Sequence, residues 1–136
     1  MGNACRHSKV KALIDSLPPT GKLLAAASIV AFKPFPLLSH YSASKYAVRG
    51  LTSAYAMELA PEHITVNAYC PGIVGTAMWE QIDAELGKKT GAAEGETIKK
   101  FSEDLIALGR TSRPDDVANF VGFLASRDSD YMTGQR

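Results

Sequence analysis

The sequence has few cysteines, no long apolar segment and no run of charge of one sign, and each absence excludes a class of protein. Cys5 and Cys70 are the two cysteines in 136 residues. Their separation matches neither a disulfide framework nor the ligand spacing of a metal site, so no metal is expected. Sparse, unpaired cysteine favours a reducing intracellular compartment, and we expect a cytoplasmic protein.

The charges are balanced, with 15 Lys and Arg against 14 Asp and Glu and a formal net charge of +1 at pH 7. Because the basic residues form no single cluster, we expect neither a nucleic-acid partner nor a membrane-surface partner. Every apolar run is shorter than the roughly 20 residues that cross a bilayer. The length and a hydrophobic content of 46% suit one globular domain with its own core.

The first half of the chain has a strand–helix–strand pattern. The segment "GKLLAAASIV" is a continuous apolar run bounded by turn signals, which is typical of a strand buried on both faces of a parallel sheet. A helical pattern follows from Ser39, a suitable N-cap, to about Leu59, where Pro61 ends it. The segment "HITVNAYC" alternates apolar and polar residues and is rich in β-branched side chains, which predicts a second strand.

Further helices are expected around this unit. The spacing of apolar residues predicts helices over Asn3–Leu17, Met78–Leu86, Glu96–Leu108 and the segment "RPDDVANFVGFLAS". The order is that of an α/β protein with a parallel sheet. Two parallel strands with both edges open do not make a stable sheet. We therefore expect more strands from elsewhere, or a longer chain of which this one is a part.

The segment "YSASK" places Tyr41 and Lys45 four residues apart, so both side chains lie on one face of the predicted helix. A lysine ammonium beside a phenol favours the phenolate and lowers the tyrosine pKa from its usual value of about 10. A tyrosine tuned in this way can exchange a proton with a carbonyl or alcohol oxygen. The pair taken alone favours a solvated helix face, because such pairs arise often by chance, so it does not establish a catalytic site.

Two other features accompany this pair. Ser28 ends the first predicted strand, at the carboxyl edge where parallel sheets bind ligands, so its hydroxyl can meet the same oxygen as Tyr41. The loop "PGIVGT" leaves the second strand at the same edge. Its Pro-Gly turn is expected to free backbone groups of Ile73 and Val74 for a ligand amide, and Thr76 suits the cap of the following helix.

In this order and spacing, the residues resemble the short-chain dehydrogenase/reductases. The resemblance spans Lys22 to Gln135 and includes "GRTSRPDDVANFVGFLAS". Within the family, "SHYSASKYAVRGLT", "ITVNAYCPGIVGTAMWEQID" and "DSDYMTGQ" are most similar to the acetoin/diacetyl reductases, also called butanediol dehydrogenases. The resemblance implies a partial Rossmann fold, a doubly wound parallel sheet represented by its C-terminal half without the first strands and the last strand.

The resemblance also implies roles for individual residues. Tyr41 matches the general acid/base, Lys45 the lysine that lowers its pKa and binds the nicotinamide ribose, and Ser28 the serine that orients the substrate carbonyl. The loop that holds the carboxamide end of NAD or NADP corresponds to Pro71, Gly72, Ile73, Val74 and Thr76. Asn67 matches a strand asparagine whose role is structural, whereas Met78 and Trp79 suit a pocket lining or core packing equally well.

The implied activity is hydride transfer between NAD(P)(H) and a small hydroxy ketone, diketone or similar alcohol, in a homo-oligomer of two or four subunits. Residues 1–136 would form the C-terminal part of a single NAD(P)-binding Rossmann domain. The family's Gly-rich phosphate-binding turn is missing before Ser28, so we expect this chain by itself to bind dinucleotide poorly. The alternative is a non-catalytic fragment or paralogue in which the subunit-interface helix that carries Tyr41 serves as an interaction module.

Overall fold

The computed structural model describes residues 12, 14–18, 20–35 and 38–136. The elements are β1 (Lys22–Ala26), η1 (Ile29–Ala31), α2 (Ser39–Leu59), η2 (Ala60–Glu62), β2 (Thr65–Tyr69), α3 (Ala77–Thr90), α4 (Glu96–Leu105), α5 (Pro114–Ala125) and η3 (Arg127–Ser129). The helix expected over Asn3–Leu17 lies mostly outside the described residues, although residues 12 and 14–16 are helical.

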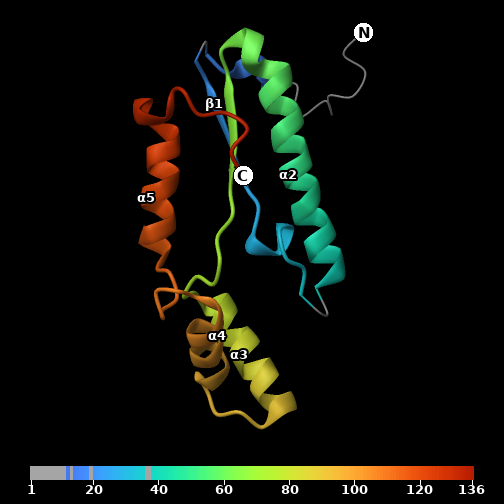
Figure 1. Ribbon diagram of the computed structural model, residues 1–136, viewed down its shortest axis with the longest axis vertical. Coiled ribbons are helices and arrows are strands. Elements are labelled where there is room, and N and C mark those ends of the chain that lie inside the picture. Colours follow the sequence, from blue (N-terminus) through green and yellow to red (C-terminus); the bar gives the residue numbers. More distant parts are fainter. Residues whose placement is uncertain (1–11, 13, 19, 36–37) are drawn as a thin grey trace.

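The two strands form a parallel sheet in which Lys22 pairs with Thr65 and Ala26 with Tyr69. Helix α2 makes the crossover that parallel neighbours require. Figure 1 shows α2 on one side of the strands, α5 on the other, and α3 with α4 together at one end. The predicted α/β class with a parallel sheet is therefore confirmed.

The hydrophobic core lies between α2 and the sheet. Ala56 and Leu59 from α2 pack against Ile64 and Val66, and Ile14 joins them from the N-terminal side. Each of these side chains is at most 5% exposed. Helical spacing on α2 and alternation on β2 thus bring one face of each element into the same core.

The first strand differs from its prediction in length and burial. It ends at Ala26, because Ser28 caps the turn η1 through an Oγ that accepts from the Val30 amide at 3.3 Å. Four of its five residues are half-buried and Ala26 is exposed, whereas Val66, Asn67 and Ala68 of β2 are buried. Within the described chain β1 has a strand neighbour on one side only, so the expected burial on both faces is wrong for β1.

Helix α2 occupies the predicted range, but its start differs in detail. Leu38 is the N-cap residue, since its carbonyl already accepts the first helical bond, from the Ser42 amide at 2.7 Å. Ser39 is therefore inside the helix, and the prediction that it caps α2 is wrong. At the other end Pro61 lies in η2, which follows directly after Leu59, the last α-helical residue, as expected.

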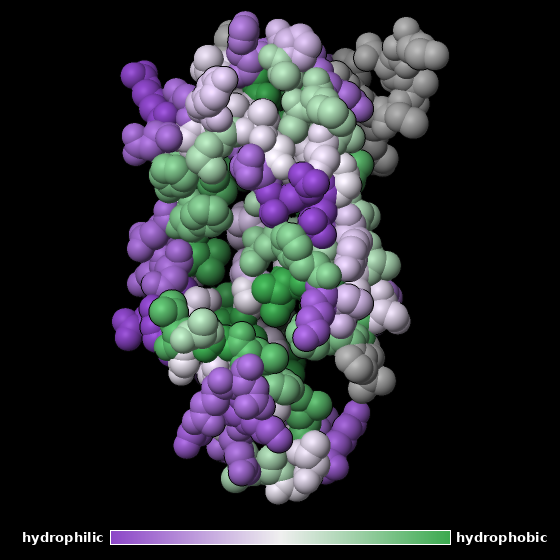
Figure 2. All heavy atoms as spheres, viewed as in Figure 1, coloured by the Kyte–Doolittle hydropathy of each residue, from purple (hydrophilic) through white to green (hydrophobic). Residues whose placement is uncertain are grey.

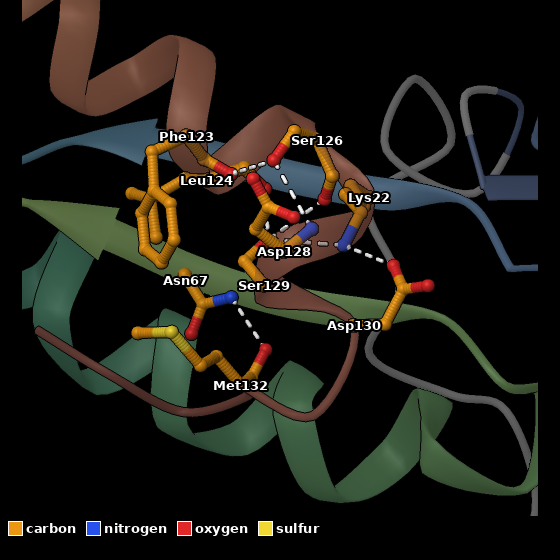
Figure 3. Close-up of polar contacts among 9 residues, drawn as sticks. All are labelled: Lys22, Asn67, Phe123, Leu124, Ser126, Asp128, Ser129, Asp130 and Met132. Atoms are coloured by element: carbon orange, nitrogen blue, oxygen red, sulfur yellow. Dashed lines mark hydrogen bonds and ion pairs between the residues drawn. The ribbon is translucent and has the colours of Figure 1, made fainter.

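The segment after α5 is fixed to both strands by buried polar side chains (Figure 3). The Ser129 side chain is fully buried and its Oγ donates to the carbonyls of Leu124 and Ser126. Lys22 Nζ from β1 donates to the same Oγ at 3.0 Å and forms an ion pair with Asp130 at 2.8 Å. The end of α5 is thereby held against the first residue of β1.

The last residues run along the free edge of β2. The Gly134 amide donates to the Val66 carbonyl at 2.7 Å, and the Ala68 amide donates to the Gln135 carbonyl at 2.8 Å. Asn67, which is fully buried, donates from Nδ2 to the Met132 carbonyl and accepts at Oδ1 from the Gln135 amide. This confirms a structural role for Asn67 and explains why β2 is more buried than β1.

Helices α3 and α4 form a hairpin. Helix α3 is longer than the predicted range Met78–Leu86, and α4 ends before the predicted Leu108. Gly91 ends α3 with a positive φ of 78°, the conformation that glycine adopts most easily. Asp83 of α3 is buried, and its carboxylate accepts from the amides of Gly95 at 2.5 Å and Ile98 at 3.1 Å. The side chain of one helix therefore satisfies the open amides at the start of the next.

Replacing Asp83 with alanine is expected to loosen α4 selectively, because two amides at its start lose their acceptor. Loss of a helix cap lowers stability by about 1–2 kcal/mol, and here the loss destabilises the hairpin of α3 and α4. Hydrogen exchange followed by mass spectrometry should show faster exchange in α4 and unchanged exchange in β2. The control is Asp104→Ala, which removes an exposed aspartate from α4 itself. Equal exchange of α4 in both variants would contradict the capping role.

The surface keeps several large apolar side chains in contact with solvent. Phe120 and Phe123 of α5 stack with ring centroids 6.5 Å apart and are 47% and 38% exposed. Figure 2 shows hydrophobic surface along the side of α5 that borders the strands. Contiguous apolar surface of this kind is typical of an interface. Among the described residues, no helix combines the length and the apolar character needed to cross a bilayer.

Candidate functional site

The segments that follow the two strands continue side by side beyond the sheet. The Ala27 amide donates to the Tyr69 carbonyl at 2.8 Å, and the Ile29 amide donates to the Pro71 carbonyl at 3.1 Å. Ser28 and the loop that begins at Pro71 are therefore neighbours at the carboxyl edge of the strands. Parallel sheets bind ligands at this edge.

Tyr41 and Lys45 share a face of α2, as the spacing predicted. Lys45 Nζ donates to the Ala26 carbonyl at 2.9 Å, where β1 ends. The same ammonium lies 5.5 Å from the centroid of the Tyr41 ring, within the range of a cation–π contact. Lys45 thus connects the helix that carries Tyr41 with the strand end that leads to Ser28. Convergence of the Ser28 and Tyr41 hydroxyls on one point stays a prediction.

The two hydroxyls differ in exposure. Ser28 is 9% exposed and its Oγ is engaged by the Val30 amide, which still leaves its hydrogen available to a ligand. Tyr41 is 38% exposed, and its hydroxyl makes no hydrogen bond with the residues that the structure describes. The tyrosine therefore keeps both donor and acceptor capacity for a bound molecule.

The loop Pro71–Thr76 is held by the segment before α5. The Ser112 amide and hydroxyl both donate to the Ile73 carbonyl, at 3.0 and 3.1 Å, and the Gly75 amide donates to the Ser112 carbonyl at 2.9 Å. The Ile73 carbonyl is thus already engaged, which corrects the expectation that it is free. Within the described chain, the amides of Ile73 and Val74 and the carbonyl of Val74 remain open to a ligand.

Thr76 stands at the N-cap position of α3 with an extended backbone, but its side chain makes no capping hydrogen bond. The predicted position is confirmed and the predicted capping bond is wrong. The hydroxyl of Thr76 is consequently available beside Val74. Met78 is 61% exposed and Trp79 is half-buried at the start of α3, so neither is packed into the core.

Cys70 lies between these segments and is the free thiol in the described residues. Burial raises the pKa of the Cys70 thiol, and the nearby Ser28 amide, Arg49 and Lys45 oppose this shift only in part. Among the described residues, no group of three or more potential metal ligands occurs. Cys70 is half-buried, as expected of a small packing residue.

We expect Cys70 to react with iodoacetamide more slowly than an exposed cysteine at pH 8, because the raised pKa leaves less thiolate and burial limits access. Peptide mass spectrometry separates Cys70 from Cys5 and gives the rate at each pH. The rate should keep rising above pH 9. A rate that levels off below pH 8 would show that the neighbouring charges outweigh burial.

Sequence reasoning missed Tyr46 and Arg49 of α2. Tyr46 Oη donates to the Phe32 carbonyl at 2.9 Å, and Arg49 Nη1 donates to the Ala31 carbonyl. A signal was present, since Arg49 stands four residues after Lys45 and eight after Tyr41 on the same helix face. The spacing did not predict which backbone carbonyls these side chains bind.

The chain matches, over residues 6–136, a family model described as "Enoyl-(Acyl carrier protein) reductase". It is 61% identical over 121 residues to L-2,3-butanediol dehydrogenase of Corynebacterium glutamicum, covering 89% of this chain and 46% of that protein. It is 50% identical over 116 residues to diacetyl reductase [(S)-acetoin forming] of Staphylococcus epidermidis, covering 85% and 45%. The chain thus spans less than half the length of these curated relatives.

A solved structure supports the same relationship. A short chain dehydrogenase family protein of Francisella tularensis superimposes with a TM-score of 0.87 at 29% identity, over 93% of this chain and 52% of that one. The parallel strands, the helix carrying Tyr41 and Lys45 and the loop at Pro71 all fall within the matched residues. The chain belongs to the short-chain dehydrogenase/reductase family.

Proposed function

We propose that residues 1–136 form the C-terminal part of a single NAD(P)-binding Rossmann domain. The protein transfers hydride between NAD(P)(H) and a small hydroxy ketone, diketone or similar alcohol. The observation that carries this proposal is the placement of Lys45, which binds the end of β1 while lying beside the Tyr41 ring. The similarity to butanediol dehydrogenase and diacetyl reductase supports the substrate class.

In this proposal Tyr41 is the general acid and base. Its hydroxyl donates a proton to the substrate oxygen during reduction and recovers it during oxidation. The positive charge of Lys45 favours the phenolate that forms when the proton leaves. Ser28 donates a hydrogen bond to the same oxygen and orients the carbonyl. The exposure of the Tyr41 side chain and the hydroxyl hydrogen of Ser28, which stays available while its Oγ accepts from the Val30 amide, support these roles.

The residues of the Pro71–Thr76 loop fit a nicotinamide carboxamide. That group offers one acceptor and two donors, and the open Ile73 and Val74 amides, the Val74 carbonyl and the Thr76 hydroxyl are complementary to it. Pro71 and Gly72 shape the turn, and a Cβ at Gly72 would come into ordinary van der Waals contact with Ile29. When bound, NADH or NADPH would supply the hydride for reduction and NAD+ or NADP+ would accept it in oxidation, and Lys45 would also hold the ribose.

The test is reduction of diacetyl and acetoin by the natural full-length protein, followed as oxidation of NADH and, separately, NADPH at 340 nm. Turnover with at least one cofactor is expected. Absence of turnover with either cofactor, in a protein that is folded by circular dichroism, would contradict the proposed activity.

The free thiol of Cys70 supports a cytoplasmic location, which fractionation of the cells would test.

A second candidate is a non-catalytic interaction module, and the surface of α2 favours it. Tyr46 and Met57, eleven residues apart and therefore on one face of a long helix, are 43% and 74% exposed. We propose that α2 pairs with its copy in a homo-oligomer, in which these side chains are buried. Sedimentation of the wild type and of Met57→Glu distinguishes the cases: dissociation by the charge supports pairing through α2, and an unchanged oligomer contradicts it.

A further inference from the structure

Three neighbouring side chains of α2 hold the last residue of β1 and the segment that follows it. Lys45 donates to the Ala26 carbonyl, Arg49 to the Ala31 carbonyl and Tyr46 to the Phe32 carbonyl. Ser28 lies between the first of these contacts and the other two. The path of this segment is therefore set from the same helix that carries Tyr41.

Arg49 is the most constrained of the three side chains. Its guanidinium carbon lies 3.8 Å from the centroid of the Phe32 ring and 5.9 Å from that of Tyr46. Its Nε is buried and makes no hydrogen bond within the described residues. Burial of Nε removes this nitrogen from water without giving it a hydrogen-bond partner. The contacts of the guanidinium with the Phe32 ring and the Ala31 carbonyl offset that loss. A lysine can supply the charge but not the planar stacking.

The turn that Arg49 holds has little rigidity of its own. η1 contains three residues, and short 3₁₀ turns have poor hydrogen-bond geometry. Ser28 forms its start, since its carbonyl accepts from the Ala31 amide at 3.0 Å and its Oγ from the Val30 amide. Arg49 binds the carbonyl at its end. Moving the end of so short a turn also moves the serine at its start.

We infer that Arg49 is a positioning residue that holds the Ser28 turn in register with Tyr41 and Lys45, an inference that rests on the proposed function. Tyr41, Lys45 and Arg49 stand at intervals of four residues along α2. The same side of the helix therefore carries the general acid, the positive charge beside it and the side chain that positions Ser28. Arg49 acts through Ser28 and touches neither substrate nor cofactor in this scheme.

The test compares Arg49→Met, Arg49→Lys and Phe32→Leu in the natural full-length protein. In Arg49→Met we expect kcat to fall by about 10- to 100-fold, as misplacement near 1 Å can cause, with the cofactor KM within about twofold of wild type. Arg49→Lys should recover part of kcat because it restores the charge. Phe32→Leu, at an exposed position, removes only the stacking and should give a smaller loss.

Hydrogen exchange supplies a readout that needs no turnover. Peptides covering residues 28–32 should exchange about tenfold faster in Arg49→Met, because the turn loses a charge-assisted hydrogen bond, while β2 peptides stay unchanged. Lys33→Met is the matched control. Its side chain is exposed in the same segment and makes no hydrogen bond or ion pair with the described residues.

The outcomes separate the inference from the proposed function. An active wild type whose Arg49→Met variant keeps both its exchange and its kcat overturns the inference alone. Faster exchange without any loss of kcat also overturns it, because the turn would then be irrelevant to the reaction. A folded wild type without NAD(P)H-dependent turnover overturns the proposed function and with it the catalytic importance of Arg49. Faster exchange together with a selective loss of kcat, partly restored by lysine, supports the inference.

Discussion

Replacing Tyr41 with phenylalanine is expected to lower kcat for carbonyl reduction by about 10²- to 10⁴-fold, the usual contribution of a positioned general acid. The change removes one oxygen and keeps the ring that lies beside the Lys45 ammonium. Packing of α2 on the strands does not involve the hydroxyl, so stability and association should stay unchanged. Steady-state kinetics with saturating cofactor measure the loss.

The matched control for this substitution is Tyr131→Phe, which removes the same atom from a tyrosine that is fully exposed. It should leave kcat unchanged. A Tyr41→Phe variant that keeps more than about a third of wild-type turnover would contradict the acid/base role, because so small a loss is below that of general acid catalysis. Loss of turnover with an intact oligomer would also separate the enzyme from the interaction module.

Replacing Asn67 with alanine is expected to lower the free energy of unfolding by about 2–4 kcal/mol, since a buried side chain is removed and the part-buried Met132 carbonyl and Gln135 amide each lose their partner. Asn67 is fully buried and binds Met132 and Gln135, residues more than sixty positions away. Without it the C-terminal residues should leave the edge of β2. Urea denaturation monitored by circular dichroism measures the change.

Two further variants define the cause of this loss. Asn67→Asp keeps the size but places a second acceptor opposite the Met132 carbonyl, so it should destabilise at least as much as alanine. Asn119→Ala removes an asparagine from the exposed side of α5 and should change stability by less than about 0.5 kcal/mol. If Asn67→Ala and Asn119→Ala were equally stable, the bonds to the C-terminal residues would be unimportant for folding.

Local signals predicted the main elements because their causes lie within a few residues. The long helix ends before Pro61 and the last one begins at Pro114, since a proline has no amide for the helix interior but is tolerated in a first turn. The cap of α2 was wrong by one residue, where Leu38 rather than Ser39 takes the first helical bond. A difference of one residue depends on the approach of the preceding loop.

The sequence likewise predicted those features of the candidate site that depend on local spacing, but not its long-range contacts. The four-residue spacing placed Tyr41 and Lys45 on one face, and the rule for parallel sheets placed Ser28 near the loop at Pro71. The backbone groups of Ile73 were expected to be free, yet Ser112 binds its carbonyl from 39 residues away. No periodicity carries that information, because the contact depends on how the segment before α5 returns to the loop.

The sequence by itself determined the helices, the two parallel strands and the edge at which the candidate residues gather, because propensity, spacing and proline act over a few residues. Only the tertiary structure decided which side chains hold those elements in place. Asp83 caps another helix, Lys22 binds Ser129 at a separation of 107 residues, and Arg49 reaches the turn at Ser28. Such contacts arise when a buried polar group needs a partner, and the packed chain alone determines which partner is near.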